Sequence, residues 1–395
     1  MRSRVHIHGV KSTPRTPLFP ADGVARGQRF LAILRPLLLS LSLLPSAGCS
    51  KEGSSDQPLT VGFIYVGPRD DYGYNQAHAE GAAALAKLAG VKTREEENVP
   101  ETVAVQKTLE SMINLDGATV IFPTSFGYFD PHILKVAEKF PDKIFLHCGG
   151  LYDGSKHPSN VGSYFGYIDE AEYVSGIVAG MTTKSGKLGF IAAKPIPQVL
   201  RNINAFTLGA RSVNPSVTTA VIFTGDWSMP VKEAEAANSL IDQGVDVLTA
   251  HVDSPKVIIE LAERRGAFST GYHTNQATLA PKGYLTGAEW NWSKVYTDYM
   301  TFIREGKPYP HLLRGGFKEG YIKISPYGPA VSEEAKKKAE EAKAKLTEGT
   351  LTIFQGPIMN NEGKVVIADS VAQQQTDIAL ESMDYLVAGA LGSTR

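Results

Sequence analysis

The repeated alternation of short apolar runs with helical stretches constrains the fold of this chain more than any other feature. The first run, Val61–Val66, leads into a turn at Gly67–Gly73 and then into a helix predicted from Asn75 to Ala89. Short continuous apolar runs between helices indicate parallel strands in a sheet that is covered on both faces. The same pattern predicts further strands at residues 119–124, 143–148, 161–167, 187–193, 217–224 and 246–251, a short one ending at 271, and one at 284–287.

The alternation of helices and apolar strands begins again at Asp169, so we predict two α/β lobes of similar size. A length of 395 residues is also too long for one ordinary core. Lobe 1 is predicted over residues 59–168 and lobe 2 over residues 169–287, with residues 288–395 returning to complete both lobes. The helices predicted between the strands cover residues 99–115, 131–140, 169–182, 197–212, 231–243, 254–265 and 293–305.

The end of the chain lacks this rhythm. Residues 317–324 alternate apolar and polar side chains like a strand, and the charge run at 332–348 is typical of a helix with a solvated face. Residues 371–391 are predicted to form a final helix. Its apolar side chains, which would dock on a lobe, are Ile378, Met383, Leu386 and Val387.

The N-terminus indicates export. Arg26, Arg29 and Arg35 flank or interrupt the apolar stretch at 30–44, and small residues precede Cys49. This pattern is typical of a secretory signal, and the apolar run is too short to span a membrane. Residues 1–49 are therefore predicted to be a signal peptide, with a polar linker at 50–58. The Ala-Gly-Cys ending resembles the bacterial lipobox, which implies lipidation of Cys49; plain secretion is the alternative.

Composition and motifs give no support to catalysis. The net charge of −1 provides no basic field for nucleic acid or an anionic membrane surface. The chain has no HExxH, GxSxG, CxxC, GxxxxGK[ST] or GxGxxG run. His147 and Cys148 are neighbours on a strand and point to opposite faces, so they cannot share a metal. We predict Cys148 to be a small core residue, and we predict no enzyme activity, metal or cofactor.

Aromatic and polar side chains follow one predicted strand after another. Tyr72, Tyr74 and Asn75 come after the first strand, and all three tryptophans of the chain come after later ones. Ligands of open α/β sheets collect beyond the carboxyl ends of the strands, so these positions predict a site for a flat polar ring. The other strand-end segments are residues 125–130, 225–227, 252–254, 271–276 and 289–292.

Some of these residues have a structural alternative. Asp253 and Ser254 also suit the N-cap of the following helix, with Pro255 in its first turn. Asp70 and Asp71 suit a turn and a helix start as well as they suit ligand contact.

Several runs resemble the basic membrane protein family of substrate-binding lipoproteins, of the purine nucleoside receptor type. The runs are the lipobox-like Cys49, GFIYVGPxxDxGYNxxHxxG at 62–81, TSFGYFDP at 124–131, INxFxLGAxSVNP at 203–215, AxxLIDQGVDVLTxHxDS at 237–254 and QGPIxxNxG at 355–363. The resemblance implies a type I periplasmic binding protein, with two Rossmann-like lobes and three crossovers near residues 166–170, 287–290 and 315–320. It also implies a receptor for an ABC importer that binds purine nucleosides or bases.

Carried over by position, the resemblance implies ligand contacts from both lobes. We expect Trp227 to stack on the ligand, and Trp292 and Tyr72 belong to the same candidate set. Asn275 stands where nucleoside binders tend to carry an aspartate, and its amide would match the amine and ring acceptor of adenine. The remaining expected contacts are Tyr74, Asn75, Ser125, Phe126, Gly127 and Asp253.

The expected ligand is therefore an adenine-type base or nucleoside. The expected partners are an ABC permease and ATPase, and the membrane through a lipid on Cys49, with the chain a monomer in the cell envelope. A sensor or surface module without transport is the alternative function, and riboflavin or a sugar is the alternative ligand.

Overall fold

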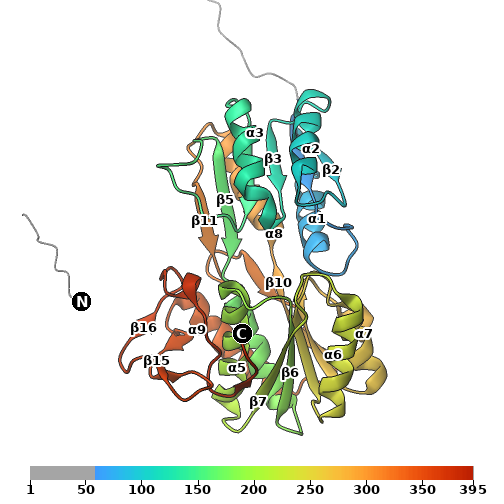
Figure 1. The fold of residues 1–395 in the computed structure, drawn as a ribbon, viewed down its shortest axis with the longest axis vertical. Helices are drawn as coiled ribbons and strands as arrows, with labels where there is room; N and C mark the ends of the chain where they lie inside the picture. The colour runs from blue at the N-terminus through green and yellow to red at the C-terminus, as the bar shows by residue number, and fades with distance from the viewer. Residues whose placement is uncertain (1–57, 395) are drawn as a thin grey trace, which may run out of the picture. The chain divides into compact units, whose positions relative to one another are not determined.

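The computed structural model describes residues 58–394 of the chain. The predicted signal peptide, Cys49 and all of the linker except Pro58 lie outside the described residues. Two main sheets organise the described part, and we call each sheet with its packed helices a lobe (Figure 1).

Lobe 1 contains a six-stranded sheet in which every neighbouring pair of strands is parallel. Its strand order is β11-β5-β4-β3-β1-β2. The strands are β1 (Leu59–Ile64), β2 (Val91–Glu96), β3 (Val120–Pro123), β4 (Ile144–Cys148), β5 (Val161–Gly166) and β11 (Leu312–Gly315).

Lobe 2 contains a seven-stranded sheet of order β12-β10-β9-β8-β6-β7-β17. Only β12 runs antiparallel to its neighbour, β10. The strands are β6 (Lys187–Ala192), β7 (Thr218–Phe223), β8 (Val247–His251), β9 (Phe268–His273), β10 (Tyr284–Trp290), β12 (Ile322–Ile324) and β17 (Ala390–Leu391).

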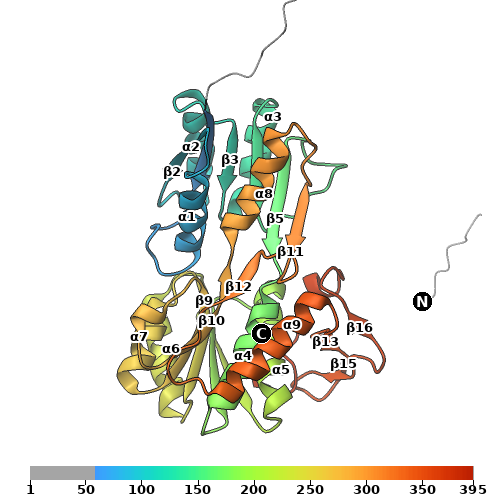
Figure 2. The same ribbon diagram turned by 180° about the vertical axis from the view of Figure 1, so that it is seen from behind.

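Helices cover both faces of each sheet, as the continuous apolar strands predict (Figure 2). In β3, Val120 and Phe122 pack toward α1 and α8, while Ile121 packs toward α2 and α3. In β6, Phe190 packs toward α4 and α5, while Ile191 packs toward α6 and α7. The helices are α1 (Tyr74–Leu85), α2 (Val103–Asn114), α3 (Leu134–Lys139), α4 (Asp169–Thr182), α5 (Pro197–Val213), α6 (Pro230–Asp242), α7 (Lys256–Arg265), α8 (Trp292–Arg304) and α9 (Glu333–Glu348).

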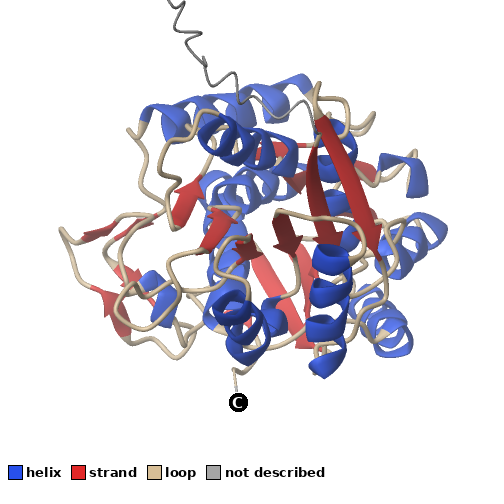
Figure 3. Ribbon diagram, turned by 90° about the horizontal axis from the view of Figure 1, so that it is seen from above, coloured by secondary structure: helices blue, strands red, loops and turns tan. Residues whose placement is uncertain are grey.

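The chain passes between the two sheets three times. It leaves lobe 1 after β5, returns after β10 through α8, and leaves again after β11 to form β12. Seen from above, helices surround the strands of both sheets (Figure 3). The predicted α/β architecture and its three crossovers are therefore confirmed.

The predicted final helix at 371–391 is wrong. The segment instead forms β16 (Ala372–Gln373), a short turn of helix (Leu380–Ser382) and β17. Its backbone finds partners on lobe 2: Asn204 Nδ2 donates to Tyr385 O at 2.8 Å, and Val387 N donates to Asn204 Oδ1 at 2.8 Å. The apolar residues have helical spacing, but the segment instead forms tertiary hydrogen bonds and pairs with the edge of β7.

Two other expectations need correction. The predicted strand at 317–324 shrinks to β12, because residues 317–320 form a turn in which Gly320 has a φ of +74°. The sequence pattern also missed β2, whose run VKTREE is polar because β2 is an edge strand and is only partly covered.

Candidate ligand-binding site

The loop after β1 contacts the loops that follow β8 and β9. Because β1 belongs to lobe 1 and the other two strands to lobe 2, these contacts join the lobes at the carboxyl ends of their strands. The hydrogen bonds run from Tyr74 N to Asp253 O (2.8 Å), from Gln276 Nε2 to Tyr72 O (2.6 Å), from Thr274 Oγ1 to Glu80 Oε1 (3.2 Å), and from Ser254 Oγ to Asp71 O.

Asp71 organises the first loop. Its carboxylate accepts the backbone N–H groups of Gly73 (2.8 Å), Asn75 (3.1 Å) and Gln76 (3.0 Å), which are the free donors at the start of α1. Burial raises the pKa of this carboxyl, and the hydrogen bonds oppose that rise. The structure thus favours the helix-start interpretation of Asp71.

Asn75 is held inside the same loop. Its Oδ1 accepts Gly67 N at 3.2 Å, and its Nδ2 donates to Asp71 Oδ2 at 2.8 Å. The side chain is buried, and both ends of the amide are used by the protein. Tyr74, next to it, donates its hydroxyl to Thr124 O at 2.5 Å. The side chains of Asn75 and Tyr74, which were predicted to contact the ligand, therefore stabilise the loop in this structure.

The second loop of lobe 1 carries Ser125, Phe126 and Gly127. Ser125 Oγ and Gly127 N both donate to Glu101 Oε1, at 2.5 and 2.8 Å. Phe126 is 63% exposed, so its ring is free to contact a ligand. Glu101 was missed from the sequence because it follows β2, the strand that the pattern did not predict.

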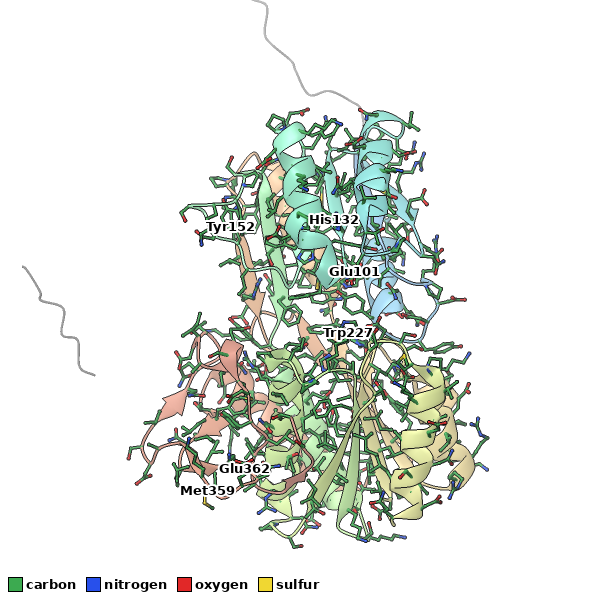
Figure 4. The ribbon with its side chains drawn as sticks, in the orientation of Figure 1. Glu101, His132, Tyr152, Trp227, Met359 and Glu362 are labelled. Atoms are coloured by element: carbon green, nitrogen blue, oxygen red, sulfur yellow. The ribbon has the colours of Figure 1, made fainter. Side chains whose placement is uncertain are left out.

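Trp227 and Asp253 form the corresponding surface of lobe 2. Asp253 N donates to Trp227 O at 2.8 Å, which fixes the two residues side by side. Trp227 lies where lobe 2 faces lobe 1, and Glu101 lies at the facing end of lobe 1 (Figure 4). The Trp227 ring is partly exposed, and Lys194 Nζ lies 5.6 Å from its centroid.

The carboxyl group of Asp253 is unpaired. Within residues 58–394 no group donates a hydrogen bond to it. Burial raises its pKa to about 8, and the negative charges of four nearby acids add to the rise. Near neutral pH the group is therefore largely a neutral acid with one donor and one acceptor to offer. The four acids are Asp71, Glu101, Glu233 and Asp226.

Two of the residues predicted to contact the ligand do not lie beside Trp227 and Asp253. Trp292 is fully buried and stacks between His78 and Trp290, with centroid distances of 5.1 and 4.6 Å. Asn275 is exposed, and its Oδ1 accepts Ala277 N at 2.9 Å in a tight turn. The expected N-cap at Ser254 is also wrong, because its hydroxyl bonds Asp71 O of lobe 1 and gives α7 no cap.

Sequence reasoning also missed a buried polar layer beneath these loops. Asn202 Nδ2 donates to Tyr272 Oη at 2.9 Å, and Trp290 Nε1 donates to His273 Nδ1 at 2.9 Å. Burial lowers the pKa of His251 to about 3, so this ring is neutral at pH 7. The position of two histidines in the sequence could have indicated this layer, since His251 and His273 are the last residues of β8 and β9.

A small cleft lies beside the first crossover. Arg201 Nε is 3.1 Å from Asp169 Oδ2 there, so this buried cation is paired. Arg314 instead donates to neutral acceptors, Ser163 O and Gly150 O, and no described carboxylate pairs with it. The other lining residues are Phe165, Gly166, Tyr167, Ile168, Gln198, Asn202 and Glu381.

Cys148 is buried and is not in a disulfide, as expected of a small core residue. Within residues 58–394 no cluster of histidine, cysteine and acidic side chains is suited to hold a metal ion. None of the helices described has the length and apolar character that a membrane span requires.

Comparison with known proteins identifies relatives over most of the chain. The profile of the Bmp family, described as ABC transporter substrate-binding protein PnrA-like, matches residues 59–353. A purine-binding protein of Brucella abortus (strain 2308) is 36% identical over 337 residues, covering 85% of this chain and 93% of that protein. A putative ABC transporter glucose-binding protein of Haloferax volcanii is 32% identical over 340 residues, covering 86% of this chain and 82% of that protein.

Solved structures agree on the fold. An ABC transporter solute-binding protein of Conexibacter woesei has a TM-score of 0.63 and 22% identity, over 74% of this chain and 97% of that one. A transcriptional activator of the comK gene from Bacillus halodurans has a TM-score of 0.65 and 22% identity, over 74% and 99%. The predicted type I solute-binding fold is thereby confirmed.

Proposed function

Because the chain belongs to the PnrA-like family of ABC transporter substrate-binding proteins, we propose that it binds a purine, as free base or nucleoside, between its two lobes. Membership of this family implies a small-molecule ligand and a permease and ATPase as partners. One observation carries the proposal: a backbone hydrogen bond holds Trp227 next to Asp253 where the lobes meet, and the carboxyl group of Asp253 is free. The purine-binding relative at 36% identity supports the same ligand class.

The chemistry of these side chains suits a planar heterocycle. Trp227 and the exposed ring of Phe126 offer faces for stacking, which is worth roughly 1–3 kcal/mol per base in nucleobase binding. Asp253 adds directional hydrogen bonds at the ring edge, in surroundings where burial strengthens them.

We further propose that the ring is adenine-like. Asn275, whose amide would match adenine, has its amide oxygen engaged in a turn. Asp253 supplies the same donor and acceptor pattern when it is protonated, and a pKa of about 8 keeps it protonated near neutral pH. This pattern complements the amine and the neighbouring ring nitrogen of adenine.

A calorimetric panel tests the ligand. Adenine, adenosine, hypoxanthine, inosine, guanosine, glucose and riboflavin are titrated into the protein at pH 7. We expect adenine or adenosine to bind most tightly. Tight binding of guanosine with no response to adenine would refute the adenine preference, and binding of glucose or riboflavin without any purine would refute the purine proposal.

A sugar is the second candidate ligand. The glucose-binding name of the 32% identical relative favours it, and the side chains of Arg314, Asn202 and Gln198 at the small cleft carry donors for hydroxyl groups. Glucose affinity that falls in Arg314→Ala and survives in Trp227→Ala would support this candidate over a purine.

We also propose that the mature chain begins at a lipidated Cys49, is a monomer, and feeds an importer. Mass spectrometry of the membrane-extracted protein should show the mass of lipid at Cys49, and Cys49→Ser should abolish it. In cells, deleting the gene should abolish uptake of labelled adenine. Normal uptake in the deletion strain would instead favour a sensor or a surface module.

A further inference from the structure

The contact between the lobes is built from the protein's own backbone. Tyr74 N donates to Asp253 O at 2.8 Å, and the side chains of Ser254 and Gln276 reach across to the carbonyl oxygens of Asp71 and Tyr72. We propose that these residues form a latch that holds the lobes closed through backbone atoms and through the side chains of Ser254 and Gln276, and that Gly73 is the position that permits closure. The latch is defined as residues 71–74 of lobe 1 with Asp253, Ser254 and Gln276 of lobe 2.

Gly73 lies at the closest approach of the lobes. A Cβ atom at this position would lie 1.8 Å from Asp253 O, 2.9 Å from Asp253 C and 3.0 Å from Ser254 Cα. All three are backbone atoms, which cannot swing aside as a flexible side chain can. A side chain at position 73 would therefore meet the backbone of the opposite lobe directly.

Each half of the latch is held rigid by its own lobe. On lobe 1, Asp71 ties the loop to the start of α1 through three backbone N–H groups. On lobe 2, Gln276 is fully buried, its Oε1 accepts Tyr272 N at 3.2 Å, and its Nε2 also donates to Tyr272 O at 2.8 Å. The two surfaces are therefore preorganised, and closing them requires little further ordering of the chain.

The latch and the ligand group share one residue. The backbone N–H of Asp253 donates to Trp227 O, and its carbonyl oxygen accepts a hydrogen bond from Tyr74 N, which leaves its carboxyl free. Closing the latch thus brings the Asp253 carboxyl and the Trp227 ring to lobe 1. Apparent affinity scales with the fraction of molecules in the binding-competent state, so residues that set this fraction change affinity from outside the site.

The test compares Gly73→Ala with Gly154→Ala. Gly154 is an exposed glycine of lobe 1, and a Cβ there would come no closer than 3.5 Å to the Tyr152 ring. Without ligand, we expect Gly73→Ala to increase the radius of gyration in small-angle X-ray scattering and to speed hydrogen exchange at the Tyr74 amide. Gly154→Ala should match wild type in both measurements. A Gly73→Ala protein with the wild-type radius and wild-type exchange would overturn the proposal.

The second measurement is affinity for adenine, and it depends on the proposed function. We expect Gly73→Ala to weaken binding at least about tenfold, mainly through faster dissociation, with an unchanged melting temperature for the ligand-free protein. If wild type binds no purine while Gly73→Ala still opens the lobes, the proposed function fails and the latch stands. If wild type binds adenine and both glycine variants bind equally well, the latch fails.

Ser254→Ala provides an independent variant should Gly73→Ala fold poorly. It removes the hydroxyl that bonds Asp71 O and leaves all backbone groups of the latch in place. We expect faster exchange at the Tyr74 amide and a few-fold loss of affinity. Exchange equal to that of wild type would contradict the proposal.

Discussion

The loop after β1 and the loop after β8 meet face to face, yet they use their carboxylates in opposite ways. Asp71 of the first loop accepts hydrogen bonds from Gly73, Asn75 and Gln76. Asp253 of the second loop has no partner within the described residues. The carboxylate of the first loop is therefore satisfied by hydrogen bonds within the protein, whereas the carboxyl group of the second loop remains available to a ligand. We therefore propose that hydrogen-bonding recognition of the ligand belongs mainly to lobe 2 and that this loop of lobe 1 serves closure.

Replacing Asp253 is expected to have the largest effect on ligand affinity. Asp253→Ala should weaken adenine binding by about 100-fold, because the loss leaves the polar edge of the ligand unpaired at a cost of about 1–3 kcal/mol. The melting temperature of the ligand-free protein should be maintained or raised, since a buried carboxyl among other acids disappears. Calorimetry and thermal unfolding measure the two quantities. An unchanged affinity would contradict the assignment of recognition to lobe 2.

The next effect distinguishes a ligand-stacking tryptophan from a core tryptophan. Trp227→Ala should weaken adenine binding at least about tenfold while the protein remains folded, because it removes one stacking face. Trp292→Phe is the matched control: it should lower the melting temperature and leave the affinity near that of wild type, since Trp292 is buried between His78 and Trp290. If the two variants exchanged these effects, the site would lie at the crossover instead.

Asp71→Ala should act mainly on stability. Losing the acceptor for three N–H groups at the start of α1 should lower the free energy of unfolding by about 1–2 kcal/mol, as for other helix caps. Affinity should fall only a few-fold, through a loosened latch. Chemical denaturation measures the first quantity and calorimetry the second. A loss of affinity as large as that of Asp253→Ala, with stability intact, would mean that both loops contact the ligand directly.

The smallest effect is on pH dependence. The pKa of Asp253 is raised to about 8, so the closed protein holds a proton that the unfolded chain releases near 3.8. The contribution of this group to stability therefore falls as pH rises from about 4 to about 8. Adenine affinity should fall as pH passes through about 8, because the donor is lost and a negative charge appears beside Asp71 and Glu101. Asp253→Asn should remove this dependence, and a wild-type affinity that is flat from pH 6 to 9 would argue against a protonated Asp253.

The fold was largely predictable from local pattern. The continuous apolar strands had to be buried on both faces, which fixes a parallel sheet between helices. The exceptions include β2, which is polar because it lies at a sheet edge, and residues 371–391, which form tertiary hydrogen bonds with partners such as Asn204 in place of the predicted helix. Met359 and Glu362, also in the C-terminal segment, lie well away from Trp227 (Figure 4).

The candidate site was predictable only in part. Strand-end position correctly brought Trp227 and Asp253 together, because the parallel strands β7 and β8 of one sheet place their carboxyl ends at the same edge. Residue type alone could not tell that Trp292 points into the core or that Asn275 closes a turn. The contacts between the lobes use backbone atoms and the close approach at Gly73, which leave no signal in side-chain chemistry.

The most direct test of the account is a crystal structure of the protein with adenine. We predict that the base stacks on Trp227, that its amine and ring nitrogen lie within hydrogen-bond distance of the Asp253 carboxyl, and that Tyr74 N donates to Asp253 O. Adenine bound away from Asp253, or held by the loop after β1 while the Asp253 carboxyl stays unpaired, would contradict it.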